Sequence, residues 1–190
     1  MASTTSSSRK RICSASLAEV VPAKGDLSQV ADLIRDVAAA ELMPRFRNLS
    51  KDDIRQKRPN DFVTVADIAS EQRLASGLVK ILPGVPVVGE EAVEENAGLL
   101  ALIGRPGQMC WIVDPLDGTA NFAAGKATFA VIVALVEDGR TIGGWIFDVP
   151  NGRMAIARAG QGVCFHSWSL HVDLRRSYFP RSAFPWHRLD

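Results

Sequence analysis

Acidic side chains follow two apolar segments of the chain, at the point where each segment stops. Glu90 and Glu91 come directly after "VPVVG", and Asp114 and Asp117 come after "MCWIV". We expect both segments to be buried strands, so these carboxylates are carried on stiff strand ends. Carboxylates held near one another repel, and a cluster of hard oxygen ligands suits Mg²⁺. The pattern therefore predicts a magnesium site formed by the two strand ends.

The second of these segments continues as "DPLDGTANF", which adds features of an anion site. Pro115 restricts Asp114 to an extended backbone and stiffens the loop. Gly118 allows a sharp turn, after which a short helix is expected to begin with the N–H groups of Gly118 and Thr119 at its end. A helix N-terminus of this kind binds phosphate. Metal carboxylates beside a phosphate site indicate phosphoryl chemistry.

Simpler interpretations exist for the individual residues. Asp-Gly is commonly an ordinary turn, and Asp114 alone is compatible with a helix N-cap. The combination of a strand, DPLDGT and an upstream Gly-Glu-Glu favours a site over these alternatives. We interpret Glu94 and Glu95 as an exposed helix face, Lys57 as a loop charge, and leave the role of Glu91 open.

Two other phosphate-handling motifs are excluded by spacing. Haloacid-dehalogenase phosphatases carry Asp-x-Asp-Gly-Thr, whereas Asp114 and Asp117 are separated by two residues. The extra residue would redirect the first carboxylate, which argues against an aspartyl-phosphate mechanism. The sequence has no Gly-x-x-x-x-Gly-Lys-Ser/Thr and therefore no P-loop.

The chain divides into three zones of different composition. Residues 1–25 are Ser-rich and basic and are expected to be a disordered extension. Residues 26–162 carry periodic structure. Residues 163–190 hold all three histidines and show no clean period of 2 or 3.6. The middle zone is thus the expected domain.

Within that zone, helices come first and strands later. Asp26 or Ser28 is the expected N-cap of the first helix, which carries an apolar stripe from Leu27 to Ala38. The further expectations are a polar loop at 50–60, an extended piece at 62–65, a helix at 68–82, a strand in 85–91, a helix at 92–104 and a strand at 109–113.

Two hairpin signals define the rest of the domain. Asp138-Gly139 and Asn151-Gly152 each separate β-rich segments, and such dipeptides supply the two positive φ angles of a type I′ turn. Antiparallel strands are expected near 128–136, 141–149 and 153–158. Front helices followed by a β-meander predict a layered α+β domain.

Composition excludes several classes of partner. The 22 basic and 21 acidic residues give a net charge of +1, so neither a nucleic acid polymer nor a membrane surface is an expected partner. Cys13, Cys110 and Cys164 match neither a disulfide framework nor a zinc pattern, which favours a cytoplasmic location. No apolar stretch reaches the roughly 18 residues of a spanning helix. A secretory signal is not expected, while a transit-type leader stays open as an alternative.

Three blocks together resemble the inositol monophosphatase family of metal-dependent, lithium-sensitive phosphatases. These are "DFVTVADIASE", "VVGEE" and "WIVDPLDGTANF", in the family's order, and the likeness extends to about residue 162. The resemblance implies the N-terminal half of that family's α/β sandwich. It also implies Mg²⁺ as cofactor, a small phosphate ester such as inositol 1-phosphate as substrate, and a homodimer.

The resemblance also implies metal ligands. Glu90, Asp114 and the carbonyl oxygen of Leu116 would hold one Mg²⁺, and Asp114 and Asp117 would share a second.

The remaining implied roles concern catalysis and phosphate binding. Thr119, with Asp67 behind it, would orient the metal-activated water that attacks phosphorus, and Glu90 completes the catalytic set. The N–H groups of Gly118 and Thr119 would hold the phosphate.

The resemblance stops near Gly162. The family continues with a Trp-Asp-x-Ala-x-Gly helix start whose Asp completes the second metal site, and this sequence has no such block. The hypothesis is a changed reading frame or a truncation at that point. Two alternatives to the phosphatase therefore stay open: an impaired remnant that binds only metal or a partner subunit, and a related phosphatase acting on a 3′-phosphonucleotide or histidinol phosphate.

Overall fold

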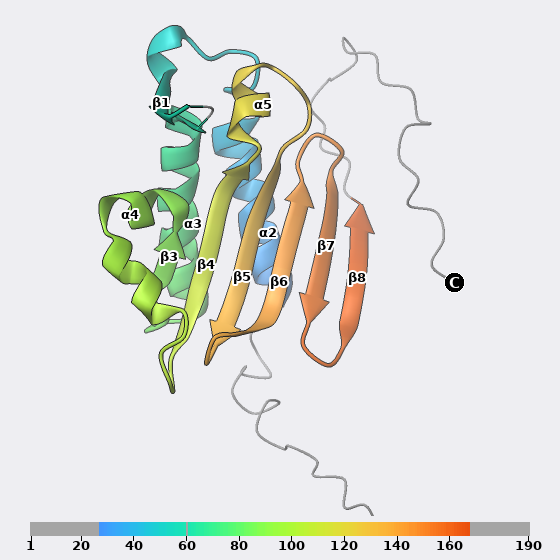
Figure 1. Ribbon diagram of the computed structural model, residues 1–190. Coiled ribbons are helices and arrows are strands. Elements are labelled where there is room, and N and C mark those ends of the chain that lie inside the picture. Colours follow the sequence, from blue (N-terminus) through green and yellow to red (C-terminus); the bar gives the residue numbers. More distant parts are fainter. Residues whose placement is uncertain (1–26, 60, 168–190) are drawn as a thin grey trace, which may run out of the picture.

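The computed structural model describes residues 27–59 and 61–167 (Figure 1). The extension predicted to be disordered, the candidate N-cap Asp26 and the end of the chain from residue 168 lie outside the described residues. The helices are α2 (Leu27–Val37), which continues as a π-helical turn (Ala38–Leu42), α3 (Val65–Ile81), α4 (Glu90–Glu95) and α5 (Thr119–Ala123), with 3₁₀ turns at Lys51–Asp53 and Ala97–Leu102. The strands are β1 (Ile54–Arg58), β2 (Asp61–Thr64), β3 (Val87–Gly89), β4 (Met109–Asp117), β5 (Ala130–Glu137), β6 (Arg140–Asp148), β7 (Arg153–Arg158) and β8 (Gly162–Ser167).

A six-stranded sheet organises the domain, with strands in the order β3-β4-β5-β6-β7-β8. β3 pairs with β4 in parallel and every other neighbouring pair is antiparallel. Helices α2 and α3 lie side by side against one face of this sheet (Figure 1). The α+β class expected from the sequence is confirmed.

The core fills the space between the two helices and the sheet. Ile34 of α2 and Leu74 of α3 are fully buried and belong to the same apolar cluster as the sheet residues Trp111 and Trp145. The two indole rings pack at a centroid distance of 5.9 Å, which joins β4 to β6 across β5. Burying such large side chains supplies most of the stabilisation of a domain this size. The core thus fixes β4, the strand that carries the acidic motif.

The two hairpins of the meander differ in geometry. Asp138 and Gly139 both have positive φ, 49° and 73°, as the predicted type I′ turn requires. At the second turn only Gly152 has positive φ, 62°, so the type I′ prediction for Asn151-Gly152 is wrong. Asn151 instead donates from its backbone N–H and its side-chain amide to the Asp148 carboxylate, which stabilises a longer connection.

Three boundaries differ from the sequence predictions. The segment predicted as a polar loop contains β1, which pairs with β2 in a two-stranded ribbon; its mostly charged residues gave no strand signal. Ser28 lies inside α2 and is not its N-cap. Glu90 begins α4, so the glutamates start a helix and do not end a strand.

Strand β8 continues the meander past residue 162, where the periodic region is expected to end. It pairs antiparallel with β7 along its full length. All six of its residues are exposed, including Phe165, so no alternation of burial marks the strand in the sequence. No helix in the described part of the chain has the length and apolar character needed to cross a membrane.

Candidate active site

Strand β4 carries the acidic motif to the end of the sheet. Its pairing with β5 is irregular between Asp114 and Asp117. Within this irregular part, the Leu116 N–H donates to Asp114 Oδ1 at 3.1 Å, while the Leu116 side chain is buried in the core. The apolar anchor and the short turn together fix the direction of the Asp114 carboxylate.

Gly118 makes the turn from β4 into α5, as predicted. Its φ of 93° lies in the left-handed region. A Cβ on this residue would meet the Thr128 carbonyl oxygen at 2.9 Å. Only glycine therefore fits, and the turn brings Thr119 to the first position of α5.

The Thr119 hydroxyl links the motif to helix α3. Its Oγ1 lies 2.8 Å from Asp67 Oδ1 and 2.9 Å from the Leu116 carbonyl oxygen. Asp67 is 2% exposed, and its Oδ2 accepts hydrogen bonds from the Thr64 N–H and hydroxyl in a capping box at the start of α3. Burial raises the pKa of Asp67, and its hydrogen bonds to Thr64 and Thr119 oppose that rise.

Glu90 and Asp114 form an electrostatically coupled pair. Desolvation, followed by repulsion from Asp114, raises the pKa of Glu90 to about 7, although 47% of the side chain is exposed. Desolvation also leads the causes that raise the pKa of Asp114 to about 6, and the Asp117 carboxylate adds to it. Carboxyl groups that repel one another when charged therefore lie together where the sequence predicts a metal.

Lys57 is part of this neighbourhood, which corrects its interpretation as a loop charge. It lies on β1 with its side chain only 12% exposed. Its Nζ is 2.7 Å from Glu91 Oε1 and 3.9 Å from Glu90 Oε1. The ammonium group offsets part of the negative charge of the two glutamates. This role was not visible in the sequence, because the mostly charged β1 gives no strand signal.

Glu71 is a buried carboxylate that sequence reasoning did not single out. It lies one helical turn after Asp67 on α3 and is 7% exposed. Its Oε2 accepts from the Glu91 N–H at 2.8 Å and its Oε1 accepts from the Ala92 N–H at 2.9 Å. The available signal was the four-residue spacing from Asp67, which places both carboxylates on one helix face.

The predicted metal ligands are compatible with Mg²⁺ in chemistry but form no ready-made cluster. Among the residues that the structure describes, no three Asp, Glu, His or Cys side chains converge closely enough to hold a metal ion. The donors at the strand ends are all oxygen atoms, which Mg²⁺ prefers. The raised pKa values of Glu90 and Asp114 mark a pair of carboxylates that a cation would stabilise.

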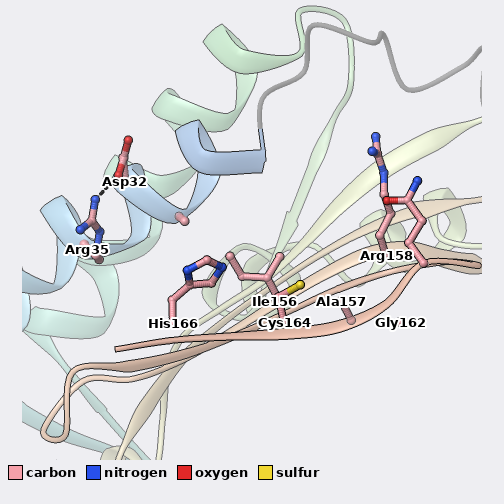
Figure 2. A pocket seen from close by; sticks show the side chains of 10 residues that line it. Asp32, Arg35, Ile156, Ala157, Arg158, Gly162, Cys164 and His166 are labelled. Atoms are coloured by element: carbon pink, nitrogen blue, oxygen red, sulfur yellow. Dashed lines mark hydrogen bonds and ion pairs between the residues drawn. The ribbon is translucent and has the colours of Figure 1, made fainter. Parts of the chain in front are cut away.

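A cavity lies elsewhere in the described part of the domain. It measures about 470 Å³ and lies between α2 and the β7–β8 hairpin, with Asp32 and Arg35 on one side and Cys164 and His166 on the other (Figure 2). Asp32 and Arg35 form an ion pair within it. None of the predicted site residues lines this cavity. The acidic motif instead lies at the C-terminal end of β4.

These features define an α+β protein whose acidic, oxygen-rich site lies where a sheet strand turns into a short helix. The sequence model of the inositol monophosphatase family matches residues 26–181, so the chain belongs to that family. The match passes the position near 162 where the resemblance was expected to end.

Individual relatives agree with this assignment. The inositol-1-monophosphatase of Rhizobium meliloti is 32% identical over 140 residues, which are 74% of this chain and 50% of the relative. The 3′(2′),5′-bisphosphate nucleotidase CysQ of Escherichia coli is 31% identical over 159 residues, 84% of this chain and 60% of the relative. The solved IMPase of Thermotoga maritima superimposes with a TM-score of 0.60 at 26% identity, covering 72% of this chain and 49% of that one. The chain spans about half the length of the curated relatives it matches.

Proposed function

We propose that this chain is a Mg²⁺-dependent phosphomonoesterase that hydrolyses a small phosphate ester, such as inositol 1-phosphate, with water as the nucleophile. The observation that carries the proposal is the Thr119–Asp67 hydrogen bond beside the coupled carboxylates Glu90 and Asp114. Metal-assisted hydrolysis needs carboxylates that bind a cation and a group that orients water, and the Thr119 hydroxyl lies next to such carboxylates. Family membership supports the same class of reaction.

The metal would be held by oxygen donors of two elements. Glu90 from α4, with Asp114 and the Leu116 carbonyl oxygen from β4, would hold one Mg²⁺, and Asp117 would join Asp114 at a second. When bound, Mg²⁺ neutralises phosphate charge and makes water a better nucleophile. The Lys57 ammonium group would offset part of the negative charge of Glu90 and Glu91.

The Thr119 hydroxyl has one hydrogen and two acceptors within reach. When it donates to Asp67, the Leu116 carbonyl oxygen is released to act as a ligand. Thr119 Oγ1 would then be able to accept a hydrogen bond from the attacking water. Asp67, kept from solvent and tied to Thr64, holds the hydroxyl in this orientation.

The turn after β4 would bind the phosphate. The first N–H groups of a helix have no partner within it, so those at Gly118 and Thr119 are suited to phosphate oxygens. The positive φ of Gly118 makes the sharp turn from β4 that places these N–H groups at the start of α5. Phosphate, metal and nucleophile would thus meet at one turn.

A second substrate class is favoured by one comparison. The alignment with the bisphosphate nucleotidase CysQ covers more of this chain than the alignment with the Rhizobium inositol-1-monophosphatase. A 3′-phosphonucleotide is therefore the alternative substrate. The site residues named above would serve either ester, because they contact the phosphate and its metal and not the alcohol.

The experiment is phosphate release by the full chain from inositol 1-phosphate and from adenosine 3′,5′-bisphosphate, with Mg²⁺, with EDTA, and with Li⁺ added to Mg²⁺. Metal-dependent release from either ester supports the proposal, and the faster ester identifies the substrate class. Release that EDTA leaves unchanged would contradict the mechanism. A folded chain that releases nothing would favour the impaired remnant. The homodimer and the cytoplasmic location stay predictions.

A further inference from the structure

Helix α4 lacks the side-chain cap that a helix start normally carries. Its N-cap is Gly89, which has no side chain to accept from the first N–H groups. The Glu71 carboxylate, from helix α3, accepts from the N–H groups of Glu91 and Ala92 instead. A residue from another helix thus performs the capping function, and it joins α4 to α3.

The glycine at the cap position is a consequence of this arrangement. A Cβ on Gly89 would lie 2.2 Å from Glu71 Cδ and 2.4 Å from its Oε1. The space that an N-cap side chain would occupy is filled by the Glu71 carboxyl group. Because Gly89 has no side chain, the Glu71 carboxyl group can reach the start of α4.

Two carboxylates on one face of helix α3 contact the two segments that carry the candidate site, the start of α5 and the start of α4. Asp67 accepts from the Thr119 hydroxyl and so fixes the start of α5. Glu71, four residues later, fixes the start of α4 through two short hydrogen bonds. Glu90 is the first residue of α4, so the direction of its side chain depends on where that helix begins. The distance between the two site segments is thereby set by a rigid helix.

We propose that Glu71 is a positioning residue, which orients Glu90 toward Asp114 by capping α4 and so sets the affinity of the site for a divalent cation. This inference rests on the proposed function, since it assigns Glu90 to a metal. Glu71 itself is occupied by two backbone N–H groups and would not contact the ion. Partners of this kind commonly change metal affinity by about 10- to 100-fold when removed.

The variant Glu71→Gln tests the inference because it keeps the size of the side chain. An amide has one acceptor oxygen, and its NH₂ group would face an N–H donor, so one of the two caps is lost. We expect Mn²⁺ binding, followed without substrate by electron paramagnetic resonance, to weaken by about tenfold. The backbone N–H groups of Glu91 and Ala92 should exchange faster with solvent, measured by NMR without metal. The maximal rate of phosphate release at saturating Mg²⁺ should fall by less than about threefold. A general loss of structure would instead reduce this rate strongly.

Glu95→Gln is the matched control, because Glu95 is exposed on α4, the helix that Glu71 caps, and the substitution removes the same charge. Gly89→Ala is a second variant that acts through Glu71 alone. Gly89→Ala should weaken Mn²⁺ binding in the natural chain, because its Cβ would collide with the Glu71 carboxyl group. In a Glu71→Ala chain, which lacks that carboxyl group, Gly89→Ala should have little further effect. Gly89→Ala alone, which keeps the Glu71 carboxyl group, tests the inference if Glu71→Gln fails to fold.

The outcomes separate this inference from the proposed function. If the natural chain binds Mn²⁺ but releases no phosphate, and Glu71→Gln still weakens binding, the positioning role stands and the phosphatase proposal fails. If the natural chain is active and Glu71→Gln binds Mn²⁺ within about twofold of it, the positioning role is wrong. A natural chain that binds no Mn²⁺ overturns both.

Discussion

The Thr119 hydroxyl lies 2.8 Å from the carboxylate of Asp67, which is 52 residues earlier in the chain. The bond joins the turn after β4 to the first turn of α3. Asp67 is in turn held by both polar groups of Thr64. The nucleophile-orienting hydroxyl of the proposed mechanism is therefore held by two buried residues, Asp67 and Thr64.

Removing either end of this pair is expected to reduce catalysis more than stability. Thr119→Ala removes the hydroxyl, and we expect kcat for phosphate release to fall by about 100-fold or more. Thr119→Ser should retain most of the rate, because it keeps the oxygen. Thr141→Ala, at an exposed position of β6, is the control. A Thr119→Ala variant with the natural kcat would refute the assigned role.

Substitution of Gly118 is expected to destabilise the domain. Gly118→Ala places a side chain at a φ of 93° and against the Thr128 carbonyl oxygen. The cost should be about 1–3 kcal/mol in the free energy of unfolding, measured in urea. Gly144→Ala is the matched control, since a Cβ there would meet nothing within 4 Å. Equal effects of the two substitutions would show that the turn is not constrained as described.

The metal-free chain is expected to lose stability as pH rises from about 4 to 7. Glu90 has its pKa raised from 4.5 to about 7, and Asp114 from 3.8 to about 6, in the folded state. In that window the folded state binds more protons than the unfolded state, so the free energy of unfolding falls with increasing pH. Burial raises the pKa values of Asp67 and Glu91 and adds in the same direction.

The measurement is the melting temperature across this pH range in EDTA. Glu90→Gln should make the dependence shallower, because it removes a carboxyl group that titrates in this range. Glu95→Gln should leave the slope unchanged. Mg²⁺ should stabilise the natural chain most above pH 7, where both carboxylates are charged. A slope that is the same with and without Glu90 would contradict the coupling of the pair.

Much of the fold followed from local signals in the sequence. The apolar run before Asp114 predicted β4, and Asp138-Gly139 predicted the hairpin between β5 and β6, because both patterns act within a few residues. The Asn151-Gly152 turn was misjudged in type because a side chain, Asp148, reshapes it. Strand β1 was missed since its stability comes from pairing with β2 and not from a buried face.

The sequence indicates only that part of the candidate site whose residues lie close together in the chain. Asp114, Gly118 and Thr119 lie within one short segment of the chain, so their spacing alone indicates chemistry. Glu71 acts on backbone N–H groups 20 and 21 residues later, and backbone atoms leave no mark in a sequence. The charge of Lys57 acquires its role only when β1 places it beside Glu91.

The most direct test of the account compares Asp114→Asn with Asp52→Asn, an exposed aspartate outside the site. The quantity is the Mg²⁺-dependent rate of phosphate release from whichever ester the natural chain hydrolyses faster. We predict that Asp114→Asn lowers this rate by about 100-fold or more while the chain stays folded, and that Asp52→Asn leaves it unchanged. A rate for Asp114→Asn within about twofold of the natural chain would contradict the assignment of this carboxylate, and with it the proposed metal-assisted hydrolysis.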